Sequence, residues 1–508
     1  MENELTKNMS QIASYIQTLE ANIAAISSVA DTVKHTVGPK GLDVMLVDQY
    51  GDFKCTNDGV EVLSSIQIQH PAAKLLIEIS KAQEKHVGDG TTSVVIFANE
   101  ILRLSLQKIK EGYQTIPLIK GLNKALEKVI ELLERHSTPI NRVDDPRLRS
   151  VTHIAARGDK EITDLLTKLS EDVANANSFE YLVSEFNLFE SIYTCSRRES
   201  EIIGGYFIPK RPHYNYDSDF YDPKCLIIDG PLEPEAFSSE VISTDTGVSH
   251  LDQSVEKLFS IAEKIKNVGI KAIFLSASIL PKLEEYFIKE GIFVLSNLRQ
   301  KDINALLRIS GASKVNRQRV LSADNSELKS ISGDLESIQK SFSPLGVFIK
   351  GTKAYEATIL LAAELDSALA EKKRIAIDAA HAYKKCLESG YVLGGGIAEI
   401  NLIERLKRSQ DSLSYNKDTM VGFDIIVEAL PALFKQIVFN AGYDPDEKLN
   451  LIDFHASNKN GIDLETGEII NYDFSGILDP LASKISIFKI VKELVSQVLK
   501  IKMILQAK

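Results

Sequence analysis

The chain of 508 residues lacks several features that mark common protein classes. It has no tryptophan, and its four cysteines are too widely spaced for a CxxC pair; they are Cys55, Cys195, Cys225 and Cys386. This spacing excludes a zinc-ribbon or thiol–disulfide motif and is typical of a reducing cytosol. Because no run of 18 apolar residues occurs and the first residues are polar and acidic, we expect no membrane contact and no targeting segment.

A basic excess is also missing. The formal net charge of -11 argues against a surface made for nucleic acid. A hydrophobic content of 44% with 25% charged residues indicates a folded chain, and its length predicts about two to four domains. No repeat of about 20 to 50 residues is present, which argues against a solenoid.

Apolar residues recur at helical spacing near both chain ends. The first stripe runs through Ile12, Ile16, Leu19, Ile23, Ile26 and Val33, and similar stripes return in residues 423–437 and 487–505. Between the ends, short β-rich runs at residues 225–228, 272–275 and 292–295 alternate with helical stretches. This pattern predicts helical ends and an inserted α/β region, a multidomain α and α/β fold.

The sequence GDGTTS occupies residues 88–93 and opens a long apolar helix. Free N–H groups and the positive dipole end at a helix start favour a polyphosphate. Asp89 adds an oxygen ligand of the kind that Mg²⁺ prefers. A simple acidic turn that caps the helix explains the same residues equally well.

Five further positions carry glycine turns or acids. They are residues 36–41 (TVGPKG), 56–59 (TNDG), 394–396 (GGG), 476–480 (GILDP) and Asp378. Taken singly, each has a plain alternative: a helix-ending turn, a hairpin turn, a loop, a helix N-cap and a surface acid. Together they indicate Mg-nucleotide binding with water activation on a scaffold other than a P-loop or a kinase, because those motifs are missing.

These motifs resemble those of the group II chaperonins, and more closely subunits of the eukaryotic cytosolic chaperonin (CCT/TRiC, T-complex protein 1 family). The resemblance runs nearly end to end, and its carriers are residues 37–41 (VGPKG), 56–59 (TNDG), 69–74 (QHPAAK), 87–94 (VGDGTTSV) and 476–480 (GILDP). The subunit type stays open: residues 66–94 are similar to the gamma type and residues 503–508 to theta, while zeta or eta also fit.

The resemblance implies a chaperonin fold in which three domains are built from five segments. They are an equatorial helical domain from residues 1–136 and 394–508, an intermediate hinge domain from 137–194 and 357–393, and an apical substrate-binding and lid domain from 195–356. It also implies two stacked rings of eight paralogous subunits in the cytoplasm, which bind non-native proteins, actin and tubulin among them.

The resemblance further assigns site residues for ATP or ADP with Mg²⁺. Asp89 would bind the metal, Asp58 would help to place the metal or the attacking water, and Asp378 would orient that water. The residues that would contact the nucleotide are Gly38, Pro39, Gly90, Thr91, Thr92, Ser93, Lys160, Gly395 and Asp479. Residues 88–93 are called the phosphate loop below. Because Asp378 would belong to a different domain from this loop, hydrolysis would depend on domain closure.

Three positions depart from the family pattern. Leu393 replaces a proline before the glycines, residues 362–364 (AAE) replace an Arg-Gly-Gly or Arg-Gly-Ala turn, and Lys373 replaces a glutamate. The last two changes predict weaker hinge contacts and slow hydrolysis. Periodicity alone predicts one helix over residues 355–388, whereas the resemblance implies strand, turn and helix.

The apical segment that matches the family's substrate-binding helix is residues 280–291. We expect Leu283, Phe287 and Ile288 to be buried, and the outward residues to be Lys282, Glu284, Glu285 and Lys289. Such a mixed charged surface favours polar, selective contacts or is simply a solvated face. Residues 238–253 match the lid protrusion.

The sequence therefore predicts an ATP-hydrolysing subunit of a hetero-oligomeric double-ring chaperonin. A second hypothesis is a structural ring member that binds nucleotide but hardly hydrolyses it. The acids Asp58, Asp89 and Asp378 favour the first hypothesis, and the altered hinge residues favour the second. A third, an unrelated metabolic ATPase or kinase, requires a small-molecule site that the sequence does not display.

Overall fold

The computed structural model describes residues 2–47, 50–196, 199–213, 216, 218–234, 245–363, 366–411, 416–452 and 458–503. The chain forms two compact units: unit 1 comprises Met1–Thr163 and Asp378–Lys508, and unit 2 comprises Asp164–Ile377. Both chain ends thus belong to one unit. The finer division into three domains stays a prediction.

Unit 1 is mainly helical. Its longer helices are α1 (Glu2–Val33), α3 (Pro71–Val87), α4 (Thr91–Lys110), α5 (Thr115–His136), α6 (Pro146–Ala155), α17 (Ile403–Asp411), α18 (Lys417–Ala429), α19 (Ala432–Asn440) and α22 (Leu481–Val498). Shorter elements are η1 (Lys34–Thr36), α2 (Gly59–Ser65), α16 (Ile397–Ile400), α20 (Pro445–Asn450) and α21 (Tyr472–Ser475). Two hairpins, β1 (Val44–Val47) with β2 (Phe53–Thr56) and β15 (Asn460–Ile462) with β16 (Ile469–Asn471), accompany them.

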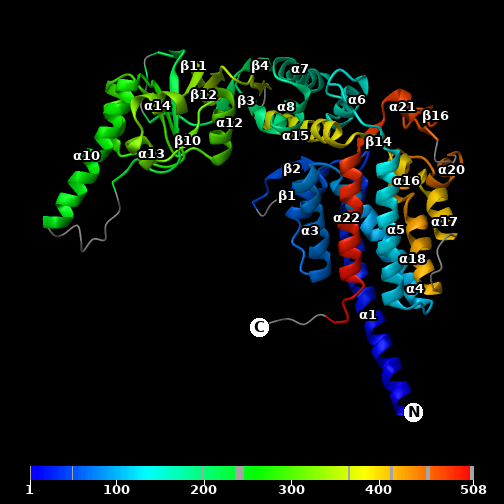
Figure 1. Ribbon diagram of the computed structural model, residues 1–508. Coiled ribbons are helices and arrows are strands. Elements are labelled where there is room, and N and C mark those ends of the chain that lie inside the picture. The colour runs from blue at the N-terminus through cyan, green and yellow to red at the C-terminus, as the bar shows by residue number, and fades with distance from the viewer. Residues whose placement is uncertain are drawn as a thin grey trace. The chain divides into compact units, whose positions relative to one another are not determined.

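The core of unit 1 joins the two chain ends. Helix α22, red in Figure 1, packs against α3, α4 and α5 from the first part of the chain. The rings of Phe97 on α4 and Phe488 on α22 lie 5.0 Å apart between centroids, and both side chains are almost fully buried. Because burial of each such side chain contributes about 1.5–3 kcal/mol, this core holds the distant segments together.

Unit 2 contains an eight-stranded mixed sheet in the order β5-β12-β11-β7-β8-β9, with β10 beside β7 and β6 beside β11. Its strands are β5 (Tyr206–Ile208), β6 (Phe220–Tyr221), β7 (Lys224–Ile228), β8 (Ala272–Leu275), β9 (Phe293–Leu295), β10 (Lys314–Val315), β11 (Gly333–Phe342) and β12 (Leu345–Gly351). Helices of this unit are α8 (Phe179–Ser184), α10 (Asp245–Val268), α11 (Pro281–Lys289), α12 (Gln300–Ser310), α13 (Arg317–Ser322) and α14 (Asn325–Ile331). Strands β7, β8 and β9 are parallel and match the three β-rich runs of the sequence.

A second, three-stranded sheet of unit 2 corrects the helix predicted from periodicity over residues 355–388. Strand β13 (Ala357–Leu361) lies between β3 (Ile192–Thr194) and β4 (Glu201–Gly204), and helix α15 (Asp366–Ser389) follows. All five residues of β13 are buried. A short apolar run that is buried on both faces shows no alternation, so periodicity cannot distinguish it from a buried helix. Glu364 of the expected turn lies outside the described residues.

The chain passes from unit 1 to unit 2 after Thr163, within helix α7 (Lys160–Ala176), and returns to unit 1 after Ile377, within α15.

The predicted apical helix exists as α11, with one correction to its outward face. Leu283 and Phe287 are fully buried and Ile288 is partly buried, while Lys282, Glu285 and Lys289 are exposed. Glu284, however, is only 5% exposed, and the ring Nδ1 of His213, whose side chain is half exposed, lies 3.0 Å from its Oε2. The expected lid segment 238–253 lies partly outside the described residues, and helix α10 begins within it.

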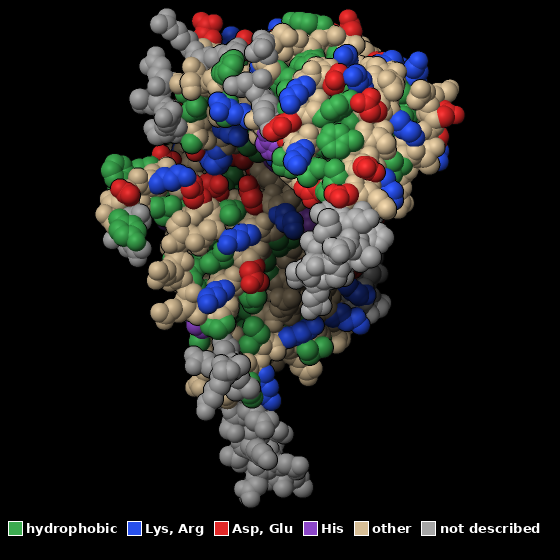
Figure 2. Space-filling view, turned by 90° about the vertical axis from the view of Figure 1, so that its left-hand side faces the viewer, with side chains coloured by type: hydrophobic (Ala, Val, Ile, Leu, Met, Phe, Trp, Pro, Cys, Tyr) green, Lys and Arg blue, Asp and Glu red, His purple; other side chains and the backbone are tan. Residues whose placement is uncertain are grey.

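Acidic and basic side chains are interspersed over the face shown in Figure 2, which fits the mixed charge of the chain. No helix among the described residues is long and apolar enough to cross a membrane.

Candidate functional site

Two glycines shape the loop between α3 and α4. Gly88 ends α3 in the left-handed region at φ 74°, and Gly90 begins α4 at φ 77°. Among the described residues no side chain caps the start of α4, so the N–H groups of Thr91 to Ser93 lack a capping acceptor. A 20-residue helix of this kind presents a positive end to an anion. The alternative of an acidic turn that caps the helix is therefore not supported, and the phosphate site stays a prediction.

Asp89 is the acid of this loop. Its Oδ1 accepts a hydrogen bond from the Gly90 N–H at 2.7 Å, and the side chain is open to solvent although protein atoms surround it closely. This crowding, followed by the nearby negative charge of Asp479, raises the pKa of the Asp89 carboxyl, while the Gly90 hydrogen bond and Lys484 oppose the rise. Because the surroundings of this carboxylate hold too little positive charge to balance it, a bound cation would stabilise it.

Gln83 ties the loop to the other end of the chain. Its fully buried amide donates to the Asp89 carbonyl oxygen at 2.7 Å and to the Ser483 carbonyl oxygen at 3.4 Å. A Cβ on Gly90 would lie 2.9 Å from Ile487 of α22. The loop thus rests on the start of α22. Sequence reasoning did not single out Gln83, although it lies only six residues before the loop acid.

Asp58 lies beside the start of α4. Its Oδ1 accepts from the Val60 N–H at 2.9 Å and so caps α2. The capping role replaces the hairpin turn considered for residues 56–59. A Cβ on the next residue, Gly59, would come within 2.5 Å of the Thr92 hydroxyl oxygen, which places the 56–59 turn directly against the phosphate loop.

The 36–41 loop is joined to α19. Gly38 has φ 87°, and a Cβ there would lie 3.2 Å from Ile437. The Asn440 amide donates to the carbonyl oxygens of Lys34 at 3.0 Å and Val37 at 2.9 Å. Gly38 and Pro39 themselves are exposed, so their backbone is accessible to a ligand.

A two-stranded ladder brings the start of the glycine loop (residues 394–396) next to Asp479. Strand β14 (Tyr391–Leu393) pairs with β17 (Leu478–Pro480), with Val392 opposite Asp479. The Gly394 N–H donates to the Ile477 carbonyl oxygen at 2.9 Å. Asp479 is therefore a strand residue, and the N-cap alternative for it is wrong: Pro480 occupies that position and provides no side-chain cap.

Asp479 shares a buried cation with Glu399. The Lys484 ammonium lies 2.9 Å from Asp479 Oδ2 and 2.8 Å from Glu399 Oε1. The side chains of Lys484 and Glu399 are 3% and 0% exposed. Burial works to lower the pKa of Lys484, but the two carboxylates outweigh it and hold that pKa above its ordinary range. Neither Lys484 nor Glu399 belongs to a motif that sequence reasoning marked as a site residue.

Asp378 reaches the same region through α15. It is half-buried, and His381 follows it one turn later on the helix. A Cβ on Gly88 would lie 2.7 Å from the His381 ring, so the part of α15 after Asp378 packs on the phosphate loop. Burial, and then the charge of Lys385, lowers the pKa of His381, which favours its neutral form.

Lys160 is exposed at the first residue of α7. No hydrogen bond or ion pair joins it to the phosphate loop among the described residues. Its proposed contact with a phosphate stays a prediction.

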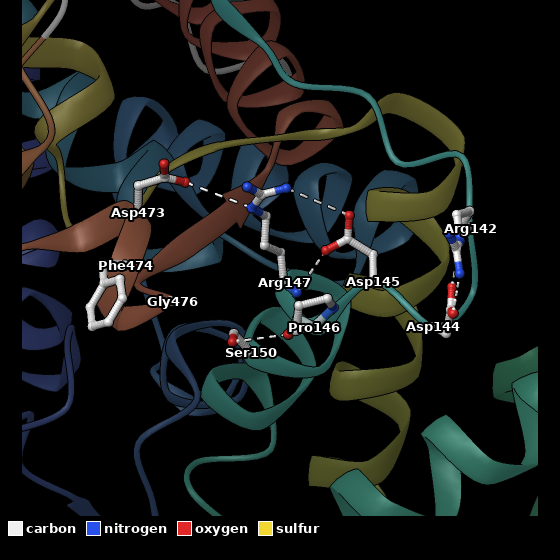
Figure 3. Close-up of a pocket in the computed structure, with 9 residues that line it drawn as sticks. All are labelled: Arg142, Asp144, Asp145, Pro146, Arg147, Ser150, Asp473, Phe474 and Gly476. Atoms are coloured by element: carbon white, nitrogen blue, oxygen red, sulfur yellow. Dashed lines mark hydrogen bonds and ion pairs between the residues drawn. The ribbon is translucent and has the colours of Figure 1, made fainter.

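A separate pocket of about 480 Å³ lies beside α6 and α21 (Figure 3). Its two arginines already have acidic partners: Arg142 binds Asp144, and Arg147 lies 3.7 Å from Asp145 and 3.9 Å from Asp473. Because acids outnumber arginines in its lining, it is poorly suited to a polyphosphate. The nucleotide motifs meet elsewhere in unit 1.

The residues present fit magnesium held jointly with a nucleotide. Within the described ranges no group of three His, Cys, Asp or Glu side chains could hold a metal alone. Mg²⁺ is ordinarily bound by one or two carboxylates with phosphates and water, and Asp89 beside the uncapped start of α4 provides that arrangement.

Comparisons with known proteins agree with this geometry. The model of the TCP-1/cpn60 chaperonin family matches residues 29–508. The chain is 29% identical to a thermosome subunit of Pyrococcus abyssi, covering 94% of this chain and 89% of that one. It is 28% identical to thermosome subunit beta of Archaeoglobus fulgidus, covering 96% and 91%. A crystal structure of a group III chaperonin in the open state superposes with a TM-score of 0.81 at 28% identity, covering 97% of this chain and all of the other. The chain therefore belongs to the TCP-1/cpn60 chaperonin family, in its thermosome and TCP-1 branch.

Proposed function

We propose that this chain is an ATP-hydrolysing subunit of a hetero-oligomeric double-ring chaperonin that binds non-native proteins and assists their folding. Chaperonins of this family are ATPases whose hydrolysis is coupled to folding, and they form double-ring oligomers. One observation carries the proposal for this chain. Unit 1 brings the uncapped start of α4, the acids Asp89 and Asp479, and the helix that bears Asp378 into one region.

The phosphates would lie at the start of α4. The N–H groups of Thr91 to Ser93 and the hydroxyls of Thr91, Thr92 and Ser93 are the donors available there. Asp89 would hold Mg²⁺, which neutralises phosphate charge when bound.

The rest of the nucleotide would lie between the two chain ends. Gly38 and Pro39 would contact it from the first end, and Gly395 from the second. Asp479 would accept hydrogen bonds from ribose hydroxyls, since its second oxygen remains free of Lys484. The resemblance of the motifs supports these roles.

Asp378 would act as the base that orients the attacking water, with Asp58 beside the phosphates and Lys160 near the γ-phosphate. Single-turnover hydrolysis of Mg-ATP by the assembled protein tests this assignment. Loss of a positioned base costs about 10²- to 10⁴-fold in rate, so Asp378→Ala should hydrolyse at least 100-fold more slowly while its ATP affinity changes little.

The control is Glu388→Ala, which removes an acid from the same helix where it pairs with Lys385 at 2.8 Å. This variant should retain the wild-type rate. Equal rates for wild type and Asp378→Ala would overturn the catalytic role.

A second candidate function is a structural ring member that binds nucleotide but hardly hydrolyses it. The altered hinge favours it: the Lys373 ammonium lies 5.7 Å from the centre of the Tyr193 ring, where the family has a glutamate. Lys372 and Ser200 instead bind the backbone of Ala362, at 2.9 and 3.0 Å. Tight Mg-ATP binding together with a wild-type rate as slow as that of Asp378→Ala would favour this candidate.

We propose further that the chain is a cytoplasmic subunit of the CCT/TRiC type, in rings of eight, with actin and tubulin among its clients. The motif resemblance in residues 66–94 supports this; residues 504–508, which resemble the theta type, lie outside the described residues. The relatives compared above are thermosome subunits, so a thermosome-like ring is the alternative. Mass spectrometry of intact particles purified from the source cells would identify the neighbouring subunits and the ring size.

A further inference from the structure

Glu399 is a fully buried acid to which the proposed nucleotide site gives no task. It is 0% exposed, and Lys484 is the cation paired with it at 2.8 Å. Neither of its oxygens has a hydrogen-bond partner within the described part of the chain, so the ion pair at Oε1 is what offsets its charge. A buried carboxylate that is only half satisfied costs stability. Its presence therefore needs a reason other than stability.

We propose that Glu399 is a positioning residue that fixes Asp479 toward the nucleotide ribose by holding Lys484. The inference rests on the proposed nucleotide site and deepens it. Glu399 itself touches no nucleotide in this arrangement and acts through the lysine.

The backbone places the three side chains firmly. Asp479 is held in the β14–β17 ladder, and Lys484 stands on the first turns of α22. Glu399 lies on α16, three residues after Gly396. A Cβ built on Gly396 would lie 2.8 Å from the Phe434 backbone nitrogen. This close packing fixes the junction between the glycine loop, residues 394–396, and α16. The carboxylates of Glu399 and Asp479 therefore approach the ammonium from two separately anchored elements.

The contacts divide the two oxygens of Asp479 between different tasks. Oδ2 binds the Lys484 ammonium at 2.9 Å. Oδ1 lies 3.2 Å from the position of a Cβ on Gly394, so it faces the glycine loop that would contact the nucleotide. An ammonium group has three donors on a flexible stem. Without Glu399, Lys484 would be free to move toward Asp89, whose carboxyl it already influences, and Asp479 would lose its fixed orientation.

The test is a comparison of nucleotides that differ only in the ribose. The full-length protein is titrated by calorimetry with Mg-ATP, Mg-2′-deoxy-ATP and Mg-3′-deoxy-ATP. A hydroxyl that donates to a well-placed carboxylate contributes roughly ten- to a hundredfold in affinity. The wild type should bind at least one deoxy nucleotide more weakly than ATP by about that factor. In Glu399→Gln the ratio of the two dissociation constants should fall to about threefold or less.

A second variant guards against failure to fold. The double substitution Glu399→Leu with Lys484→Met replaces the buried ion pair by apolar residues, an exchange that is often neutral or stabilising. It should fold and also lose ribose discrimination. Glu356→Gln is the matched control, because Glu356 is 5% exposed and pairs with Arg308 at 2.9 Å in unit 2; it should discriminate like the wild type.

The outcomes separate the two proposals. A wild type that binds no Mg-ATP overturns the nucleotide site itself. A wild type that discriminates among the nucleotides, with Glu399→Gln and the double variant keeping the same ratios, overturns the positioning role alone. An equal loss of affinity for all three nucleotides also overturns it, because that result indicates a purely structural effect.

Discussion

At the scale of single residues, Asp89 is the proposed ligand of Mg²⁺. Its carboxyl is crowded by protein and lies near Asp479, and both effects raise its pKa. Replacement by asparagine removes the charge and preserves the shape. We expect Asp89→Asn to lose at least tenfold of the Mg²⁺-dependent gain in ATP affinity, since a carboxylate is a far better Mg²⁺ ligand than an amide.

The measurement is an ATP titration with Mg²⁺ and again with a chelator. Without metal the variant should bind ATP at least as well as the wild type, because the repulsion between the carboxylate and the phosphates is gone. Asp424→Asn, which changes an exposed acid on α18 bonded to Gln410, serves as the control. A variant whose affinity still rises with Mg²⁺ as steeply as that of the wild type would show that another residue holds the metal.

The sequence revealed the residues whose role is local. In residues 88–93 the two glycines shape the loop locally and the acid lies between them, so a short motif was enough to predict the loop. Gln83, Glu399, Lys484 and His381 were missed, because their importance depends on contacts across the fold. Gln83 and Ser483, for example, are 400 positions apart in the chain. Glu284 was placed outward for the same reason, since its partner His213 comes from a distant segment.

At the scale of elements, the joint between α3 and α15 makes Gly88 a sensitive position. An alanine there must adopt φ 74°, and its Cβ would meet the His381 ring at 2.7 Å. The left-handed conformation costs about 1–2 kcal/mol for an L-residue, and overpacking adds about 1–3 kcal/mol. Gly88→Ala should therefore lower the free energy of unfolding by about 2–5 kcal/mol and slow hydrolysis by moving the helix of Asp378.

Gly442→Ala isolates the conformational part of this effect. Gly442 has φ 85°, and nothing lies within 4 Å of a Cβ built there, so only the cost of about 1–2 kcal/mol applies. Denaturant titration of both variants, together with single-turnover hydrolysis, provides the comparison. Equal destabilisation of the two variants would show that α15 yields to the added methyl group.

Helices and strands were predictable where the spacing of apolar residues in the sequence matched the residues that the element buries. Strands β7, β8 and β9 stood out as isolated β-rich runs between helices. Strand β13 was not predictable from its sequence, since its neighbours β3 and β4 lie more than 150 residues before it in the chain. All of its residues are buried. Pairing between distant strands leaves no mark in a local pattern.

At the scale of the molecule, hydrogen bonds between distant residues secure the meeting of the two chain ends in unit 1. The Tyr15 hydroxyl donates to the Leu499 carbonyl oxygen at 2.6 Å, and the Asn440 amide binds the Val37 carbonyl oxygen at 2.9 Å. The similar helical texture of both ends suggested this meeting, but these polar contacts were not visible in the sequence. They imply that unit 1 folds fully only after the last helix has been synthesised.

The β1–β2 hairpin presents an apolar face that the described part of the chain leaves exposed. Val47 lies opposite Phe53 and Met45 opposite Cys55, so these four side chains share one face. Met45, Val47 and Phe53 are 61%, 64% and 72% exposed. Clustered exposed apolar residues mark interaction sites, and a two-stranded hairpin offers free edges for another strand. Since the family forms rings, we expect this face to contact a neighbouring subunit.

Replacing Met45 and Phe53 together by aspartate tests this contact. The double variant should assemble into smaller particles than the wild type, measured by light scattering after size-exclusion chromatography, because two buried charges oppose the interface. Its isolated subunits should unfold at nearly the same denaturant concentration, since exposed substitutions change stability by only about 0.5 kcal/mol. Ile116→Asp, at a residue that is 67% exposed on α5, is the control and should leave the particle size unchanged. Full-sized particles from the double variant would show that the subunits meet through another surface.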